Sequence, residues 1–267
     1  MAFITDTHCH LNLSPLAAKA YTFINNALEK GVTGILVPGL DVDSSESAIS
    51  LQKKFPGHVY AAAGIHPNYS SDASEEDFSA IEKMASGKKV YAIGEIGLDF
   101  YRDFSQPQKQ VLVFKRMLEI AREYQLPICI HNRDADEEII QILDDWMEEL
   151  TRMNNPLADL PGVFHSYNGS EKIYQWAVQH RFLLGISGPI TFPKSSHLRK
   201  IVAEADINHL LIETDAPYLT PVPFRGRKNE PKNVIYIAEE IAKIKEINFE
   251  LVAKTTSENA KRLFNWD

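Results

Sequence analysis

Hydrophobic positions along the chain gather into eight short runs that are rich in Val, Ile and Leu. The runs span residues 3–6, 34–37, 59–63, 90–94, 128–131, 162–165, 182–186 and 210–213. Most of them contain no polar interruption, as is typical of parallel strands that are buried on both faces. The pattern therefore predicts a parallel sheet that helices cover on its outer face.

The segments between these runs have the apolar spacing of amphipathic helices. They span residues 16–29, 44–54, 75–85, 106–124, 135–150, 170–179, 197–205 and 232–245, and a further helix is predicted over 248–263. Strict alternation of eight strands and eight helices favours an α/β fold of the TIM (β/α)8 barrel type over an open doubly wound sheet. Because no linker interrupts the 267 residues, we expect a single domain over residues 1–267.

Potential metal ligands stand at the carboxyl ends of five predicted strands, which is where a parallel barrel carries its chemistry. His8 and His10 follow the first run, and they share one face because side chains alternate along an extended chain. A histidine pair alone is weak evidence for a metal site. The later runs add four groups of the same kind, which are Glu95, His131, His165 and Asp215.

Six such groups exceed the needs of one tetrahedral ion, whereas two ions bridged by a carboxylate would use them all. We expect Glu95 to be the bridge, because a central barrel strand can direct its carboxylate between ligands from either side. One metal-binding position would be completed by His8, His10 and Asp215, and the other by His131 and His165. The ions are divalent, and Mg, Mn and Zn are all open.

Each candidate ligand also has an ordinary structural interpretation when taken singly. Glu95 can cap a segment, His131 and His165 can be satisfied core histidines, and Asp215 can make a turn before a proline. Their combination at one face of a barrel favours a metal site. His66 follows the third run, and we expect it to orient a ligand or contact substrate rather than bind an ion directly.

Composition and charge restrict the class of protein. The formal net charge of −8 argues against a protein that holds nucleic acid by a broad basic surface, although it permits a phosphodiester substrate. No apolar run approaches the roughly 20 residues that cross a bilayer, and no signal pattern opens the chain. We therefore expect a cytoplasmic protein that binds no membrane and has no obligate protein partner. Cys9 and Cys129 are expected to be reduced core thiols.

Six segments of the chain together form a family signature. They are DTHCHLNL, AAAGIHP, IGEIGLDFYRD, PICIHNRDA, FHSYNGS and LLIETDAPYLTPVPFRGRKNEP. With these segments the chain resembles the TatD family of metal-dependent deoxyribonucleases over essentially its whole length. The resemblance implies an amidohydrolase-like barrel, two divalent metals at the same six ligands, and 3′-5′ exonuclease activity that prefers single strands. The connection over residues 151–161 looks longer than is usual in the family, and Tyr167 stands where phenylalanine is common.

Phosphate recognition is expected from cations near the predicted ligands. Arg102, Arg133 and Arg225 lie in loops on the ligand face, and a planar guanidinium can bind two phosphate oxygens at once. Tyr101 and Tyr218 lie in the same loops and can stack on a terminal base. The alternatives are solvated surface charge for the arginines and rim packing for the tyrosines.

The sequence thus favours a metal-dependent deoxyribonuclease that hydrolyses DNA with a metal-activated water. Asp215 and Glu95 are the expected catalytic residues, with Asp215 both binding an ion and accepting the proton of the water. The alternative among enzymes is hydrolysis of a small amide, lactone or ester, because the same ions activate water for attack on a carbonyl. A non-enzymatic metal-binding or nucleic-acid-binding protein is less favoured, since a binding module needs no open water position.

Overall fold

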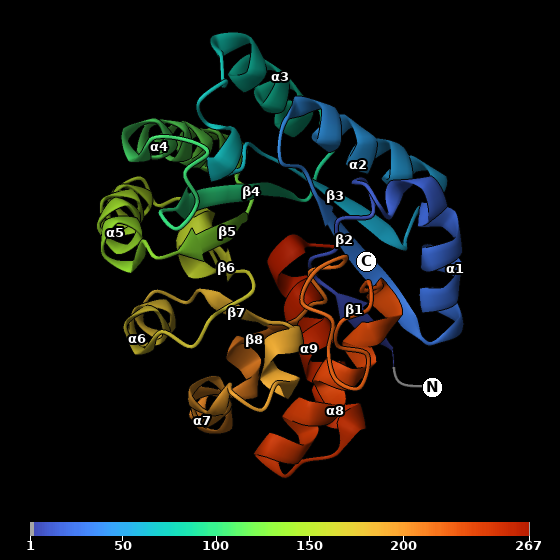
Figure 1. Cartoon of the computed structure of the whole chain (residues 1–267). Coiled ribbons are helices and arrows are strands. Elements are labelled where there is room, and N and C mark those ends of the chain that lie inside the picture. The colour runs from blue at the N-terminus through green and yellow to red at the C-terminus, as the bar shows by residue number, and fades with distance from the viewer. Residues whose placement is uncertain (1–2, 267) are drawn as a thin grey trace.

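The computed structural model describes residues 3–266, and eight parallel strands form its centre (Figure 1). Each strand pairs with the next one in the chain, so their order in the sheet is their order in the sequence. They are β1 (Ile4–Asp6), β2 (Val32–Pro38), β3 (Val59–Ala63), β4 (Ala92–Asp99), β5 (Ile128–Arg133), β6 (Gly162–Phe164), β7 (Leu183–Ile186) and β8 (Leu210–Ile212). This order is the one that the alternating pattern predicts for a barrel.

The sheet nearly closes because β8 returns beside β1. The backbone N–H of Thr7 donates to the carbonyl of Ile212 at 3.1 Å, and Cys9 pairs in parallel with Ala216 just beyond the two strands. The structure therefore confirms a TIM barrel. Cys9 and Cys129 are free and buried, as expected.

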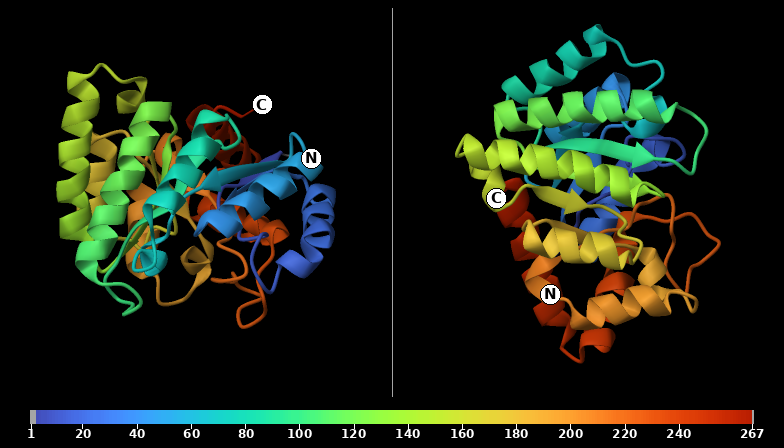
Figure 2. Two further views of the ribbon diagram at one scale, coloured as in Figure 1. Left: turned by 90° about the horizontal axis from the view of Figure 1, so that it is seen from above. Right: turned by 90° about the vertical axis from the view of Figure 1, so that its left-hand side faces the viewer.

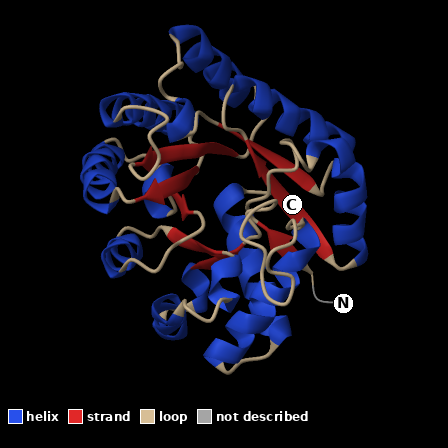
Figure 3. Ribbon diagram, viewed as in Figure 1, coloured by secondary structure: helices blue, strands red, loops and turns tan. Residues whose placement is uncertain are grey.

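Helices surround the strands, as Figure 3 shows. They are α1 (Ala20–Glu29), α2 (Val42–Lys54), α3 (Glu75–Ser86), α4 (Pro107–Tyr124), α5 (Asp136–Arg152), α6 (Glu171–Gln179), α7 (Ser196–Glu204), α8 (Val234–Lys245) and α9 (Phe249–Phe264). Short 3₁₀ helices occupy Ala17–Lys19, Pro67–Tyr69, Pro156–Asp159, Gly188–Thr191, Ile207–His209 and Pro231–Asn233. Within residues 3–266, no helix is long and apolar enough to cross a membrane.

The predicted extra helix is present as α9, and it covers one end of the barrel. Leu263, Phe264 and Trp266 pack with residues that line the barrel interior, among them Leu36 and Val163. Figure 2 (left) shows the end of α9 opposite the loops that follow β4 and β8. Because side chains fill that end, the chemistry-bearing residues are left to the other end, at the carboxyl ends of the strands.

The largest difference from the predicted elements concerns β4. The expected strand over 90–94 ends before Glu95, whereas the observed strand continues to Asp99. The register with β5 shifts between Ile93 and Ile96, and pairing then resumes. Two glycines, Gly94 and Gly97, give this stretch the pattern of a strand end, although the backbone continues along β5.

Smaller differences, of a few residues, occur at the ends of other elements. The first helix begins at Ala20 rather than at residue 16, because Ala17–Lys19 forms a 3₁₀ turn with no buried residue. The connection over 151–161 contains the 3₁₀ helix Pro156–Asp159 and leads into β6. It therefore lies at the amino end of that strand, away from the ligand-bearing end.

Candidate metal centre

The barrel brings all six predicted ligands together at the carboxyl ends of its strands. His8 and His10 follow β1, Glu95 lies within β4, and His131 lies within β5. The remaining two follow β6 and β8, and they are His165 and Asp215. All of these residues are buried except His131, which is partly buried.

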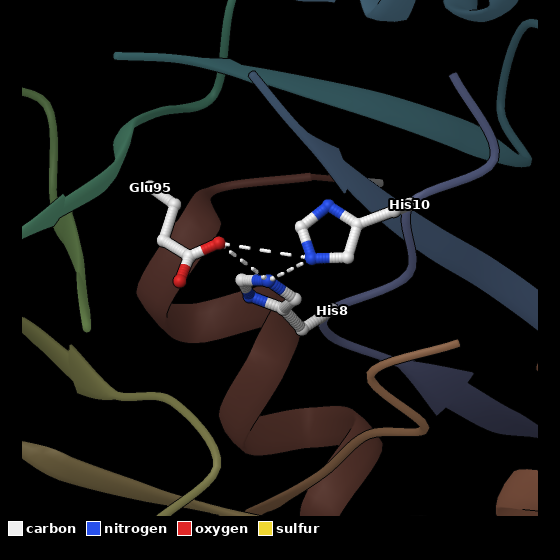
Figure 4. A group of neighbouring side chains, drawn as sticks. All are labelled: His8, His10 and Glu95. Atoms are coloured by element: carbon white, nitrogen blue, oxygen red, sulfur yellow. Dashed lines mark hydrogen bonds and ion pairs between the residues drawn. The ribbon is translucent and has the colours of Figure 1, made fainter. Parts of the chain in front are cut away.

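One oxygen of the Glu95 carboxylate, Oε2, faces the histidines that follow β1. It lies 3.3 Å from His8 Nε2 and 3.7 Å from His10 Nε2 (Figure 4). The two histidine nitrogens are themselves 3.3 Å apart, and Asp215 Oδ1 lies 3.4 Å from His10 Nε2. We call His8, His10 and Asp215 the Oε2 set.

The other oxygen, Oε1, faces histidines from the opposite side of the barrel. It lies 2.8 Å from His131 Nδ1 and 2.8 Å from His165 Nε2, and these two nitrogens are 3.3 Å apart. We call His131 and His165 the Oε1 set. Glu95 thus stands between two groups of ligand atoms, with one oxygen directed to each.

The donor atoms suit divalent metal ions of the borderline class, which bind imidazole nitrogen and carboxylate oxygen. Within residues 3–266, ligand atoms of His8, His10 and Glu95 lie within 4.8 Å of one another, and Glu95 Oε1 lies 2.8 Å from one nitrogen of His131 and one of His165. Imidazole nitrogens of neighbouring rings face each other across short distances, where an ion would take up their lone pairs. The residues around Glu95 therefore fit a centre that holds divalent metal ions.

His66 is held differently from the predicted ligands. Its Nδ1 accepts a hydrogen bond of 3.1 Å from the backbone N–H of Asn68, while its Nε2 lies 3.4 Å from Glu95 Oε1. Burial lowers the pKa of His66 to about 4, so the ring is neutral and its one proton belongs on Nε2. A protonated nitrogen has no lone pair for a metal, so this geometry is consistent with the expectation that His66 orients a ligand or contacts substrate rather than binding an ion, and Glu95 is the ligand that it faces.

Charge in the centre is balanced between the carboxylates of Glu95 and Asp215 and several imidazoles. Burial alone would raise the pKa of Glu95, but nearby His165, His66 and His8 outweigh it and hold that pKa well below its usual range. Burial lowers the pKa of His165, but Glu95 outweighs this and raises it well above the usual value. A divalent ion would replace the proton on such a histidine, so metal binding and proton release are linked.

Two carboxylates to which the sequence analysis assigned no role stand behind the histidines of the Oε1 set. Asp99 Oδ2 lies 3.3 Å from His131 Nε2, and Glu213 Oε1 lies 3.5 Å from His165 Nδ1. The side chain of Glu213 fits there because Gly185 has no Cβ, which would lie 2.3 Å from Glu213 Oε2. Alternation along β4 offered a signal for Asp99, since it comes four residues after Glu95, but the predicted strand ended too early.

The predicted substrate contacts lie near the same end of the barrel, although Arg133 is the last residue of β5 and not part of a loop as expected. The guanidinium of Arg133 lies 3.8 Å from the ring centroid of Tyr101, and that of Arg102 lies 5.8 Å from it. Arg225 stacks separately, 4.4 Å from the Phe192 ring. Tyr218 is 55% exposed and its ring lies 6.1 Å from the His10 ring, so it stands at the rim beside the centre.

Comparisons with known proteins agree with the sequence segments. The sequence model of the TatD related DNase family matches residues 5–265. The uncharacterized metal-dependent hydrolase YabD of Bacillus subtilis is 39% identical over 259 residues, which are 97% of this chain and 98% of the relative. The 3′-5′ ssDNA/RNA exonuclease TatD of Salmonella typhimurium is 36% identical over 266 residues, with 97% and 98% covered. The crystal structure of YjjV, a TatD homolog from Escherichia coli, has a TM-score of 0.88 at 28% identity and 98% coverage of both chains.

Proposed function

The chain belongs to the TatD family of metal-dependent hydrolases, and we propose that it is a deoxyribonuclease that cleaves phosphodiester bonds from the 3′ end of single-stranded DNA. The observation that carries this proposal is the position of Glu95, with one oxygen directed to each set of ligands. The residues around it would hold divalent ions, whose positive charge suits the hydrolysis of a phosphodiester.

We assign one ion to the Oε2 set and the other to the Oε1 set, with Glu95 shared. When bound, the ions supply positive charge for the phosphoryl oxygens and lower the pKa of water. Asp215 accepts the proton of the attacking water, since its Oδ1 lies at the edge of the Oε2 set and its side chain is 12% exposed. His66 Nε2 faces Glu95 Oε1 at 3.4 Å and so helps to hold the carboxylate in place.

The choice of a nucleic-acid substrate rests on the relatives and on the rim. The Salmonella relative is named as an exonuclease of single-stranded DNA and RNA. At the rim, Arg133 and Arg225 each lie against an aromatic ring, which orders the guanidinium before substrate arrives. Such pairs can bind phosphate and leave an exposed ring, such as Tyr101, for an unpaired base.

Exonuclease action predicts that a free end is required. With added Mg²⁺ or Mn²⁺, the protein should shorten a single-stranded oligonucleotide stepwise when its 5′ end carries the label. A circular single strand of the same sequence should stay intact, because it offers no end. Gel electrophoresis of both substrates checks this, and equal cleavage of the circle would contradict exonuclease action.

Arg133→Ala should weaken cleavage of DNA about 10-fold or more, since a hydrogen bond between charged groups contributes about 1.5 kcal/mol or more. It should barely change hydrolysis of a small neutral ester, which has no phosphate to bind. Arg152→Ala is the matched control, because Arg152 is 75% exposed at the end of α5. Steady-state kinetics on both substrates decides the matter. Equal losses of activity on DNA and on the ester would contradict a phosphate contact by Arg133 and favour a small-ester hydrolase.

A further inference from the structure

The carboxylate of Asp99 is shared between a loop and a histidine. Its Oδ1 accepts hydrogen bonds from the backbone N–H of Tyr101 at 3.1 Å and of Arg102 at 2.9 Å. Its Oδ2 faces His131 Nε2 at 3.3 Å. Gln110 holds the backbone of Asp99 by two bonds, of 2.8 Å to its N–H and 2.9 Å to its carbonyl. The residue is 2% exposed at the end of β4, and these hydrogen bonds hold both its backbone and its carboxylate.

His131 consequently stands between two carboxylates. Its Nδ1 lies 2.8 Å from Glu95 Oε1, and its Nε2 faces Asp99. When an ion is bound beside Glu95, only one ring nitrogen can keep a proton, and an acceptor at Nε2 keeps the proton there. The lone pair of Nδ1 is then directed toward Glu95, where the ion of the Oε1 set is proposed to lie.

The histidines of the Oε2 set have no such support. The Nδ1 atoms of His8 and His10 are buried, and neither has a hydrogen-bond partner within residues 3–266. In the Oε1 set, His165 Nδ1 also lacks a hydrogen bond, although Glu213 Oε1 lies 3.5 Å from it, so His131 is the histidine that a carboxylate holds by a hydrogen bond. The two sets therefore differ in what stands behind their ligands. A carboxylate behind a ligating histidine fixes the ring orientation and increases its basicity.

We propose that Asp99 is a positioning residue that holds His131 with its Nδ1 lone pair toward Glu95, so that metal binding at the Oε1 set depends on Asp99. Metal binding at the Oε2 set does not. This inference rests on the proposed two-ion centre. It also links the centre to the rim, because the same carboxylate fixes the backbone beside Tyr101, on whose ring Arg133 lies.

Asp99→Asn is the sharpest variant, because asparagine has the same shape and its one oxygen can still accept from Tyr101 and Arg102. Its amide would then face His131 Nε2 as a donor. His131 would have to accept there and place its proton on Nδ1, which closes that nitrogen to an ion. Titration of the metal-free protein with Mn²⁺, followed by calorimetry, should show two equivalents in the wild type. In the variant one equivalent should bind about 10- to 100-fold more weakly.

Asp103→Asn is the matched control, since Asp103 is an exposed residue of the same loop and undergoes the same chemical change. Two equivalents of unchanged affinity in Asp99→Asn would overturn the proposal. If the wild type binds only one equivalent of Mn²⁺, the two-ion centre is wrong. The role of Asp99 then stands only if Asp99→Asn binds that one equivalent more weakly than the wild type does. Combining Asp99→Asn with His131→Ala separates a positioning role from a general one. The double variant should bind Mn²⁺ as His131→Ala does, and a further loss would show that Asp99 acts elsewhere.

A measurement on the unaltered protein tests the same point. With Zn²⁺ bound, nitrogen NMR of the histidine rings should show the His131 proton on Nε2 and the ion on Nδ1. A proton on Nδ1 would overturn the proposal without any variant.

Discussion

Glu95→Gln is expected to reduce phosphodiester hydrolysis by at least about 100-fold, the equivalent of about 3 kcal/mol in the barrier. Glutamine fills the same space, but it has no charge and only one oxygen. In the wild type, Oε2 of the carboxylate lies 3.3 Å from His8 Nε2, and Oε1 lies 2.8 Å from His165 Nε2. An amide cannot accept from both sides, so one of the two ions should be lost.

Metal analysis of the purified variant distinguishes this explanation from simple unfolding. The bound metal should fall from two equivalents to one or none, while circular dichroism keeps the barrel signature. Glu258→Gln is the matched control, because Glu258 is 62% exposed on α9 and its ion pair is a surface one, with Lys254 at 3.8 Å. Two equivalents retained in Glu95→Gln would count against a bridging carboxylate even if activity were lost.

Two general rules explain why the sequence located most of the centre. His8 and His10 are two residues apart, and in an extended segment a side chain two positions on points the same way. The (β/α)8 pattern places the ends of all strands at one end of a barrel, so ligands from distant segments could be predicted to meet. The structure brings the six candidate ligands together as this reasoning requires.

The parts that the sequence could not predict depend on contacts between strands. Glu95 lies within β4, at the point where the register with β5 shifts. The glycines on either side of it are typical of a strand end, so the sequence predicted that the strand stops there. The proton position on His66 depends on one backbone N–H, that of Asn68, whose direction no residue pattern encodes. Asp99 was overlooked for a related reason, since its partner His131 belongs to the neighbouring strand.

The junction of β1 and β8 shows how the fold holds Asp215 near the histidines. Buried Asp6 accepts hydrogen bonds from Thr214, at 2.8 Å from its N–H and 2.6 Å from its hydroxyl. The same carboxylate accepts from the N–H of His8 at 3.3 Å, and the N–H of Asp215 donates to the carbonyl of His8 at 2.9 Å. Asp215 is therefore fixed relative to His8 and His10 by backbone contacts that do not involve its own carboxylate.

That independence makes Asp215→Asn an informative change. The backbone contacts remain, and asparagine keeps an oxygen beside His10, but the side chain can no longer accept a proton. Turnover at saturating DNA should fall by about 10²- to 10⁴-fold, the range typical of a lost general base, while KM changes little. Asp206→Asn is the matched control at the other end of β8, where an exposed aspartate caps the turn before the strand and asparagine can do the same. Kinetics across a range of Mn²⁺ concentrations separates the two proposed roles of Asp215. If added Mn²⁺ restores turnover, Asp215 only binds an ion, and the proton must be accepted elsewhere.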